Sequence, residues 1–183
     1  DPRSKAHLRE RLGLKHHNPI IASYGFFLPD KGIHELIGAM PVILERHPNA
    51  LLLLINARYP HVISDQEFER CEKLAVRTGV SGSVVFVDDY LENDESLCLL
   101  EACDAIVFPY QRSGESSSAA VRVGITSRRP VVTTNLPMFS ELDGIVHYAA
   151  GTSSAAIASS VLGLLDDPEA QRRLAQRQRV WLE

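Results

Sequence analysis

The sequence predicts an α/β protein built on a Rossmann-like, doubly wound parallel sheet of about six strands. Short apolar segments alternate with longer amphipathic segments along the chain. The short segments are apolar on both faces, which is typical of parallel strands that helices cover on both sides. A length of 183 residues with 45% hydrophobic side chains suits one core, and residues 1–183 are therefore expected to form a single domain.

The strands are expected at the short apolar segments. These are Ile20–Tyr24, Ala50–Ile55, Ser83–Val87, Ala105–Phe108, Val131–Thr133 and Ile145–His147. Right-handed crossovers between such strands place the ligand crevice at their carboxyl ends. The binding site is therefore expected in the loops that leave those ends: Gly25–Lys31, Asn56–Ser64, Asp88–Asn93 and Pro109–Glu115.

The segments between the strands carry the apolar spacing of helices. From Ile33 to Leu44 apolar residues recur on one helical face, and Pro41 within this run predicts a kink or a restart of the helix. Gly79 is a suitable C-terminal stop for the helix expected over Asp65–Arg77. The other helices are expected over Ser4–Gly13, Asp65–Arg77, Asn93–Ala102, a segment between Gly114 and Ser127, Ser153–Leu165 and Pro168–Trp181.

Composition and charge exclude several classes of protein. With 19 Lys+Arg against 23 Asp+Glu the formal net charge is −4, which disfavours nucleic acid as a partner. Disordered, collagen-like and disulfide-rich chains have different compositions. The three cysteines lack C-x-x-C spacing and indicate reduced, mostly buried thiols: Cys71, Cys98 and Cys103.

The sequence contains no secretory signal and no segment that could span a membrane. Its longest apolar run, Ala50–Ile55, is far shorter than the ~20 residues of a membrane helix. The chain starts at Asp1 rather than Met, and we expect it to be a part of a longer, cytoplasmic protein.

The segment Phe108–Pro130, FPYQRSGESSSAAVRVGITSRRP, is the most informative part of the sequence. A buried strand ends at Phe108, and the next helix is expected to open with a polar run: Glu115, Ser116, Ser117 and Ser118. Serines at a helix start cap the helix, which requires no ligand. The same helix start offers free N–H groups and a positive dipole end to the crevice, as a phosphate site does. The local sequence leaves both interpretations open.

A second segment, Gly25–Gly32 (GFFLPDKG), follows the first strand. Gly25 permits a turn, and Lys31 precedes the next helix at the same end of the sheet as Glu115. A lone lysine in a turn is ordinarily a surface residue. A lysine and a serine-rich helix start can nevertheless meet across one crevice, and a cation with oriented amide groups is a diphosphate site.

The order of these motifs resembles a known family of enzymes. A strand, G-x-x-x-x-x-K-G, an amphipathic helix and a leucine-rich strand come first, and P-x-x-x-x-G-E-S-S-S and R-P-V-V follow. This order is similar to the C-terminal, donor-binding domain of retaining glycosyltransferases of family four (group 1), which have the GT-B fold. The resemblance covers Ser4–Trp181 and is strongest to mannosyltransferase-type members. It implies sugar transfer from a nucleotide-diphosphate sugar, with GDP-mannose as the first expectation, to a polysaccharide or glycan acceptor.

The resemblance assigns roles by position. Lys31 matches the lysine that contacts the donor diphosphate, and Gly25 lies in the same donor-binding turn. Glu115 matches the first glutamate of a paired motif, near the transferred sugar, and is the expected catalytic residue. The backbone amides that hold the phosphates are expected at Ser116, Ser117 and Ser118.

The sequence also departs from the family pattern within the donor site. Phe26 stands where arginine is frequent, and Val123 stands where the second glutamate would bind the ribose. Asn56 begins the segment that replaces a glycine-rich turn. Arg112 or Arg122 could supply the missing positive charge on the phosphates. We interpret these departures as those of a divergent enzyme, and a site that has lost catalysis stays open as well.

No metal site or other cofactor is expected. Asp88 and Asp89 are adjacent at a strand end, as in many solvated turns, and the GT-B resemblance implies no metal held by the protein. The seven histidines, His16 and His17 included, do not stand at ligand spacing. The sequence contains no P-loop, dinucleotide fingerprint or nucleophile elbow.

The resemblance further implies that the chain is one half of an enzyme whose N-terminal, acceptor-binding domain is absent from it. We expect the chain alone to bind donor weakly and to turn over little or none. Membrane association, at the inner face of the membrane, is expected only through that missing domain. Two alternatives stay open: a non-catalytic module that binds nucleotide sugars, and a sugar-nucleotide epimerase of GT-B architecture.

Overall fold

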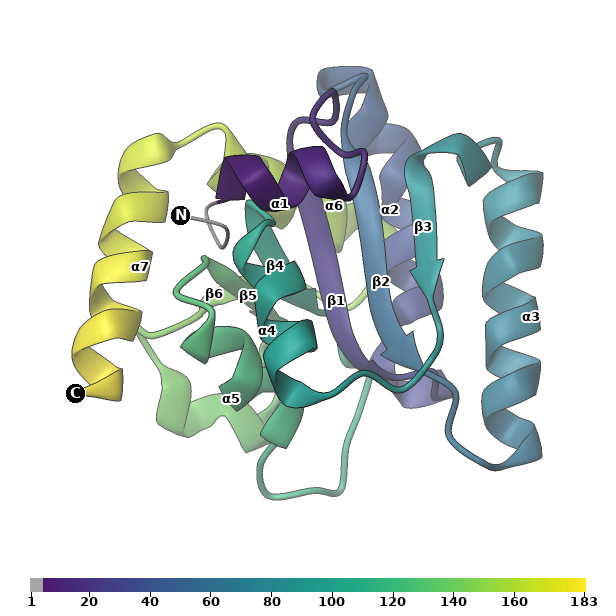
Figure 1. Ribbon diagram of the computed structural model, residues 1–183. Coiled ribbons are helices and arrows are strands. Elements are labelled where there is room, and N and C mark those ends of the chain that lie inside the picture. The colour runs from purple at the N-terminus through teal and green to yellow at the C-terminus, as the bar shows by residue number, and fades with distance from the viewer. Residues whose placement is uncertain (1–4) are drawn as a thin grey trace.

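The computed structural model describes residues 5–183, which form a six-stranded parallel sheet between two layers of helices (Figure 1). The strand order is β3-β2-β1-β4-β5-β6, and each neighbouring pair is parallel. The predicted doubly wound α/β fold is therefore confirmed. The strands are β1 (Ile20–Phe26), β2 (Leu51–Ala57), β3 (Val84–Val87), β4 (Ala105–Phe108), β5 (Val131–Thr134) and β6 (His147–Ala149).

The described residues also form seven α-helices. Ser4, the expected first residue of the N-terminal helix, lies outside the part that the structure describes. Three short 3₁₀ segments accompany the helices: η1 (Pro29–Lys31), η2 (Ser81–Ser83) and η3 (Pro137–Leu142). The α-helices are α1 (Lys5–Arg11), α2 (Ile33–Arg46), α3 (Val62–Arg77), α4 (Asn93–Glu101), α5 (Ala119–Thr126), α6 (Ser154–Leu165) and α7 (Pro168–Leu182). Of these, α2 to α5 connect successive strands, α1 precedes β1, and α6 and α7 follow β6.

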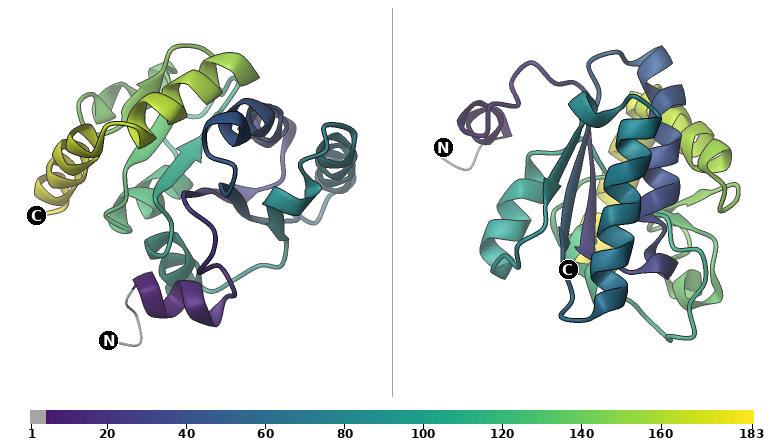
Figure 2. Two further views of the ribbon diagram at one scale, coloured as in Figure 1. Left: turned by 90° about the horizontal axis from the view of Figure 1, so that it is seen from above. Right: turned by 90° about the vertical axis from the view of Figure 1, so that its right-hand side faces the viewer.

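Alternation of side chains along the strands divides the core between the two faces of the sheet. On β2, Leu52 and Leu54 pack with the buried residues of α2, α3 and α6. Leu51 and Leu53 pack on the other face, with residues of α4 and α5. Figure 2 shows α1 and α4 on one side of the sheet and α2 and α6 on the other. Because both faces are covered, the strands are apolar on both, as the sequence indicated.

The structure corrects several predicted boundaries. β1 and β2 each run two residues further, to Phe26 and Ala57, because the two strands pair along their whole length. α3 begins at Val62 rather than Asp65, and the His61 side chain caps it by accepting from the Ile63 N–H group at 3.2 Å.

Two further corrections have local causes. β6 begins two residues later than expected because the N–H groups of Ile145 and Val146 both bond the carbonyl oxygen of Leu142 in a turn. α2 is one helix of 14 residues that continues through Pro41. Met40 and Ile43, on either side of the proline, are fully buried, and this packing supports the helix where the proline provides no N–H donor.

The sheet has its switch point at β1. β2 and β3 lie on one side of β1, and β4, β5 and β6 follow on the other. In sheets of this kind a crevice forms outside the carboxyl ends of the strands at this point. No helix of residues 5–183 combines the length and the apolar character needed to cross a membrane.

Candidate functional site

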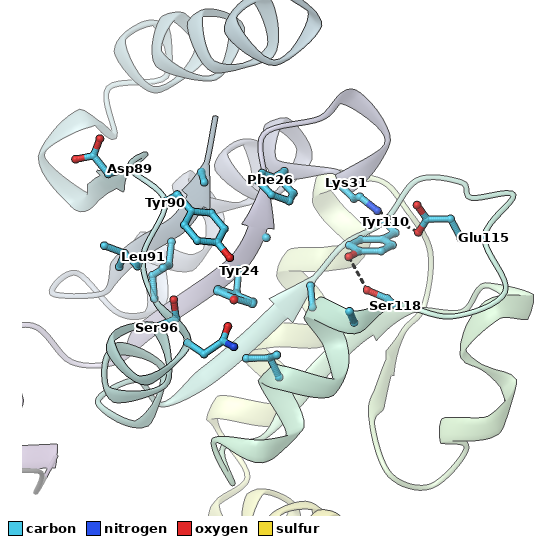
Figure 3. Close-up of a pocket in the computed structure, with 17 residues that line it drawn as sticks. Tyr24, Phe26, Lys31, Asp89, Tyr90, Leu91, Ser96, Tyr110, Glu115 and Ser118 are labelled. Atoms are coloured by element: carbon cyan, nitrogen blue, oxygen red, sulfur yellow. Dashed lines mark hydrogen bonds and ion pairs between the residues drawn. The ribbon is translucent and has the colours of Figure 1, made fainter. Parts of the chain in front are cut away.

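A pocket of about 490 Å³ lies at the carboxyl ends of β1 and β4, at the switch point of the sheet. Its walls come from the ends of β1 and β2, the loops after β3 and β4, and the first turns of α4 and α5. Figure 3 shows Tyr24 and Tyr90 toward one end of the pocket and Lys31, Tyr110 and Glu115 toward the other. The sequence predicted a site at this edge, and the pocket occupies it.

The end of β1 forms one wall of the pocket. Gly25 has a φ of +133°, and a β-carbon on it would lie 3.6 Å from the Ala120 Cβ. The backbone of β1 therefore passes close to the start of α5. Phe26 lines the pocket next to Gly25 and packs edge-on against Tyr59, with 5.4 Å between the ring centroids. An apolar ring thus stands where a cation is frequent in the family that the sequence resembles.

Lys31 is the cation of the pocket wall. It ends the 3₁₀ segment η1, and Gly32, with a φ of +72°, then turns the chain into α2. The Lys31 Nζ lies 4.3 Å from the centroid of the Tyr110 ring and 3.4 Å from the Glu115 Oε2. The Lys31 side chain is 20% exposed and that of Glu115 60%. The Lys31 ammonium group is therefore held by the Tyr110 ring and by the Glu115 carboxylate.

The start of α5 lies on the same pocket. Ser118 caps the helix, and its Oγ accepts from the Val121 N–H group at 3.4 Å. Ala119 and Ala120 line the pocket. The first N–H groups of a helix have no acceptor within the helix, and this end carries the positive part of its dipole. The arrangement places a cation and the start of a helix on one pocket, and these are the two features that attract an anion.

The sequence placed the start of this helix too early. The helix begins at Ala119, and Ser116 and Ser117 lie before it, exposed and outside the pocket wall. Glu115 precedes it as well, because the Ser113 Oγ accepts from the Glu115 N–H group at 3.0 Å and forms a local turn. Of the three serines, Ser118 is the one that caps the helix and lines the pocket.

The two arginines considered for the missing charge have other partners. The Arg112 Nε lies 3.0 Å from the Asp30 Oδ1, and its side chain is 83% exposed. Arg122 forms an ion pair with Glu141, and its guanidinium carbon lies 5.7 Å from the centroid of the Trp181 ring. Neither is part of the pocket wall.

Val123 and Asn56 complete the set of predicted positions. Val123 lines the pocket, so the expected place of the second carboxylate is on the wall but apolar. Asn56 pairs with Gly25 in the sheet and is 1% exposed. Its neighbours Ile55 and Ala57 line the pocket and Asn56 does not, because successive side chains of a strand point to opposite faces.

Sequence reasoning did not single out several residues of the wall. Tyr110 is buried between the strand end and the serine-rich segment, and its hydroxyl lies 2.9 Å from the Ser118 Oγ. Non-local pairs of this kind leave no signal in one sequence. The loop after β3 was expected at the crevice as a segment, without particular residues. Together with the start of α4 it contributes Asp89, Tyr90, Leu91, Asn93 and Ser96.

Two titratable groups outside the pocket wall, Asp88 and Cys71, are held in the fold by an ion pair and by burial. Within residues 5–183 there is no cluster of three or more His, Cys, Asp or Glu side chains that could hold a metal ion. Asp88 is bound by Arg58 at 2.8 Å. Burial, together with the nearby Glu67 carboxylate, raises the pKa of the Cys71 thiol, which keeps that thiol protonated at neutral pH. Cys71 and Cys98 are free thiols.

Comparison with known families agrees with the fold. Residues 4–181 match the family described as "Glycosyl transferases group 1". The chain belongs to this family. The predicted fold of a GT-B C-terminal domain is thereby confirmed, and so is the resemblance found in the sequence.

Individual relatives of this group 1 glycosyltransferase chain are distant. It is 27% identical over 172 residues to the uncharacterized glycosyltransferase YqgM of Bacillus subtilis, covering 87% of this chain and 43% of YqgM. It is 32% identical over 114 residues to the GDP-mannose-dependent monoacylated alpha-(1-6)-phosphatidylinositol monomannoside mannosyltransferase of Corynebacterium glutamicum, covering 62% and 27%. The chain thus spans less than half of the length of these relatives.

Among solved structures, the chain is similar to HepE of Anabaena, determined in complex with UDP and glucose. The TM-score is 0.84 with 17% sequence identity, and the match covers 99% of this chain and 47% of HepE. At this identity the similarity concerns the fold. The order of strands and the two helix layers are therefore shared by the group 1 chain and by one half of HepE.

Proposed function

We propose that the pocket binds a nucleotide-diphosphate sugar and that the chain is the donor-binding half of a retaining glycosyltransferase. One observation carries this proposal: Lys31 and the first turn of α5 line the same pocket at the switch point of the sheet. A diphosphate needs a cation and N–H donors that converge on it. Membership of the group 1 glycosyltransferases supports the assignment.

The proposed chemistry is departure of the nucleoside diphosphate while positive charge develops at the anomeric carbon. Lys31 and the amides of Ala119 and Ala120 would stabilise negative charge on the leaving phosphate. Glu115 would accept hydrogen bonds from hydroxyl groups of the transferred sugar and hold the bond that breaks in register. All of these residues line the pocket.

GDP-mannose is the first donor to test. The Corynebacterium relative is by its name GDP-mannose-dependent, whereas HepE was determined with UDP. Both nucleotides therefore belong in the experiment. We further propose a polysaccharide or glycan as acceptor, bound by a second domain, since the chain spans 43% of YqgM.

A second function is favoured by the pocket wall itself. Phe26 and Val123 are apolar at two positions where the family pattern has charged groups. A non-catalytic module that binds nucleotide sugars would tolerate this loss. Binding of donor without transfer by the whole protein would support that alternative over the enzyme.

Calorimetric titration of the chain with GDP, UDP and ADP tests the proposal. We expect one diphosphate to bind preferentially and Lys31→Ala to weaken it at least about tenfold, as is typical for a charge-assisted contact. Lys73→Ala is the matched control, because Lys73 lies on α3 and pairs with Glu69, and neither residue lines the pocket. Absence of binding of all three at millimolar ligand, or equal losses in the two lysine variants, would contradict the proposed donor site.

A further inference from the structure

Tyr110 joins the two halves of the proposed anion site. Its side chain is buried, with 3% of the residue exposed, and it lines the pocket. Its ring lies under the ammonium group of Lys31, 4.3 Å from the centroid to the Nζ. Its hydroxyl lies 2.9 Å from the Oγ of Ser118, the cap of α5 (Figure 3). One side chain therefore contacts both the cation and the helix start.

The main chain and the far edge of the ring fix Tyr110 in place. Its carbonyl oxygen accepts from the hydroxyl of Thr134, at the end of β5. The ring packs against Phe139 with 5.5 Å between centroids and against Phe108 with 6.3 Å. Tyr110 is thus anchored to the end of β5 and to η3.

The hydrogen bond between the Tyr110 and Ser118 hydroxyls can run in either direction. In each direction one hydroxyl hydrogen is used within the pair and the other needs an acceptor outside it. An anion in the pocket beside Ser118 favours donation by Tyr110, because the Ser118 hydrogen is then free to bond the anion. Ser118 Oγ in that case accepts from both Tyr110 and the Val121 N–H group, which uses both of its lone pairs.

This direction determines what Ser118 can offer to the pocket. With both lone pairs occupied, the hydroxyl hydrogen of Ser118 has no role within the cap. Ser118 lines the pocket beside Ala119 and Ala120. The remaining hydrogen is therefore a donor available to a ligand oxygen, next to the amides of the helix start.

We propose that Tyr110 is a positioning residue for an anionic ligand: by donating to Ser118 it directs the Ser118 hydroxyl hydrogen to a phosphate oxygen, and its ring holds Lys31 over the same place. This inference rests on the proposed function and deepens it, because it names the residue that brings the lysine and the helix start onto one diphosphate. Tyr110 acts through Ser118 and Lys31 and itself makes no bond to the ligand.

The experiment measures binding of inorganic pyrophosphate, the preferred nucleoside diphosphate and the matching nucleoside by calorimetry. Tyr110→Phe keeps the ring and removes the hydroxyl. We expect it to weaken both diphosphates about three- to tenfold, the loss typical of one hydrogen bond, and to leave the nucleoside affinity within about twofold. Because Tyr110 acts through Ser118, the double variant Tyr110→Phe with Ser118→Ala should bind no more weakly than Ser118→Ala alone.

Tyr148→Phe is the matched control. The Tyr148 hydroxyl donates to the carbonyl oxygen of Phe139 at 2.7 Å, outside the pocket wall, so the same atom is removed with a similar loss of one hydrogen bond. Its diphosphate affinity should equal that of the wild type. Ser118→Thr, which retains the hydroxyl, gives a second arm independent of Tyr110 and should bind diphosphate more tightly than Ser118→Ala.

The outcomes separate the two proposals. A wild-type chain that binds neither pyrophosphate nor any nucleoside diphosphate overturns the proposed function and this inference with it. If Tyr110→Phe binds pyrophosphate and the nucleoside diphosphate as tightly as the wild type does, the inference is overturned and the proposed function is not. Additive losses in the double variant would show that Tyr110 acts independently of Ser118, and equal weakening of the nucleoside would show a general effect on the fold. Either result would also overturn the inference.

Discussion

A β-carbon on Gly32 would lie 1.8 Å from the carbonyl oxygen of Pro109. The loop after β1 and the loop after β4 therefore touch through their backbones at this point. The Gln111 N–H group also donates to the carbonyl oxygen of Asp30 at 2.9 Å. This contact sets Lys31, which precedes Gly32, beside Tyr110, which follows Pro109. The geometry of the pocket wall thus depends on a glycine that touches no ligand.

Replacement of this glycine should affect both stability and binding. Gly32 has a φ of +72°, a conformation that costs an alanine about 1–2 kcal/mol. Because the contact with Pro109 is to a backbone atom, the two loops must also move apart. We expect Gly32→Ala to lower the free energy of unfolding by at least about 3 kcal/mol and to weaken diphosphate binding, as measured by urea unfolding and calorimetry.

Gly79→Ala is the control for this prediction. Gly79 has nearly the same φ, +74°, but nothing lies within 4 Å of a β-carbon built on it. It should lose only the conformational part, about 1–2 kcal/mol, and keep its affinity for diphosphate. Equal losses of stability in the two variants would show that the Pro109 contact relaxes without consequence.

The structure also predicts different effects for the basic residues around the pocket. Arg122 pairs with Glu141 and lies against Trp181, away from the wall that Lys31 forms. We expect Arg122→Ala to change diphosphate affinity by less than about twofold, as is usual for an exposed, screened charge outside the contact. A loss as large as that of Lys31→Ala would instead indicate that Arg122 contacts the phosphates.

The fold could be predicted from the sequence because its signal is local and repeated. Leu51 and Leu52, on opposite faces, and the residues that follow them make β2 apolar on both faces, and the same pattern recurs in the other strands. The first residue of a helix could not be predicted where several neighbouring residues could serve equally well as its cap. Ser116, Ser117 and Ser118 are chemically identical as caps. Ser118 is the serine that caps the helix and also bonds Tyr110, a contact that sequence spacing does not encode.

The candidate site could be predicted in part, because the order of strands and helices places the strand ends at one edge of the sheet. Lys31 and Glu115 were placed at one edge by topology, and the structure brings them to 3.4 Å. The direction of Arg122 could not be predicted, because it depends on Glu141 and Trp181, which approach from η3 and α7. A helix start gives the position of a residue along the chain but not the partner that its side chain finds.

Val123 offers a gain-of-function test of the donor site. It lies on the pocket wall, where the family pattern has a glutamate that binds the ribose. We expect Val123→Glu to raise the affinity for the preferred nucleoside diphosphate about three- to tenfold, since a carboxylate accepting a ribose hydroxyl gains about 1 kcal/mol or more. The measurement is calorimetry with the nucleotide and with its 2′,3′-dideoxy analogue.

The analogue and a size-matched variant serve as controls for Val123→Glu. The dideoxy nucleotide has no hydroxyl for the carboxylate, so its affinity should not rise. Val123→Leu enlarges the side chain without adding an acceptor and should gain nothing. A gain for the dideoxy analogue equal to that for the nucleotide would contradict a ribose at this place in the pocket.

Two histidines should make the protein less stable in mild acid. Burial lowers the pKa of His147, and burial together with the Arg70 guanidinium lowers the pKa of His34. In the unfolded chain both take up a proton near pH 6.5, whereas in the native protein they do so only at lower pH. The unfolded state therefore binds more protons in this range, and the free energy of unfolding falls as the pH falls.

The contribution of these histidines is complete above about pH 6.5 and is lost as the pH drops through their native pKa values. Urea unfolding at pH 7.5, 6.5 and 5.5 measures it. The double variant His34→Gln with His147→Gln cannot take up these protons, so its free energy of unfolding should decline less between pH 7.5 and pH 5.5 than that of the wild type. An identical or steeper decline in the variant would mean that both histidines titrate alike in the folded and unfolded chains, and that carboxylates alone set the acid sensitivity.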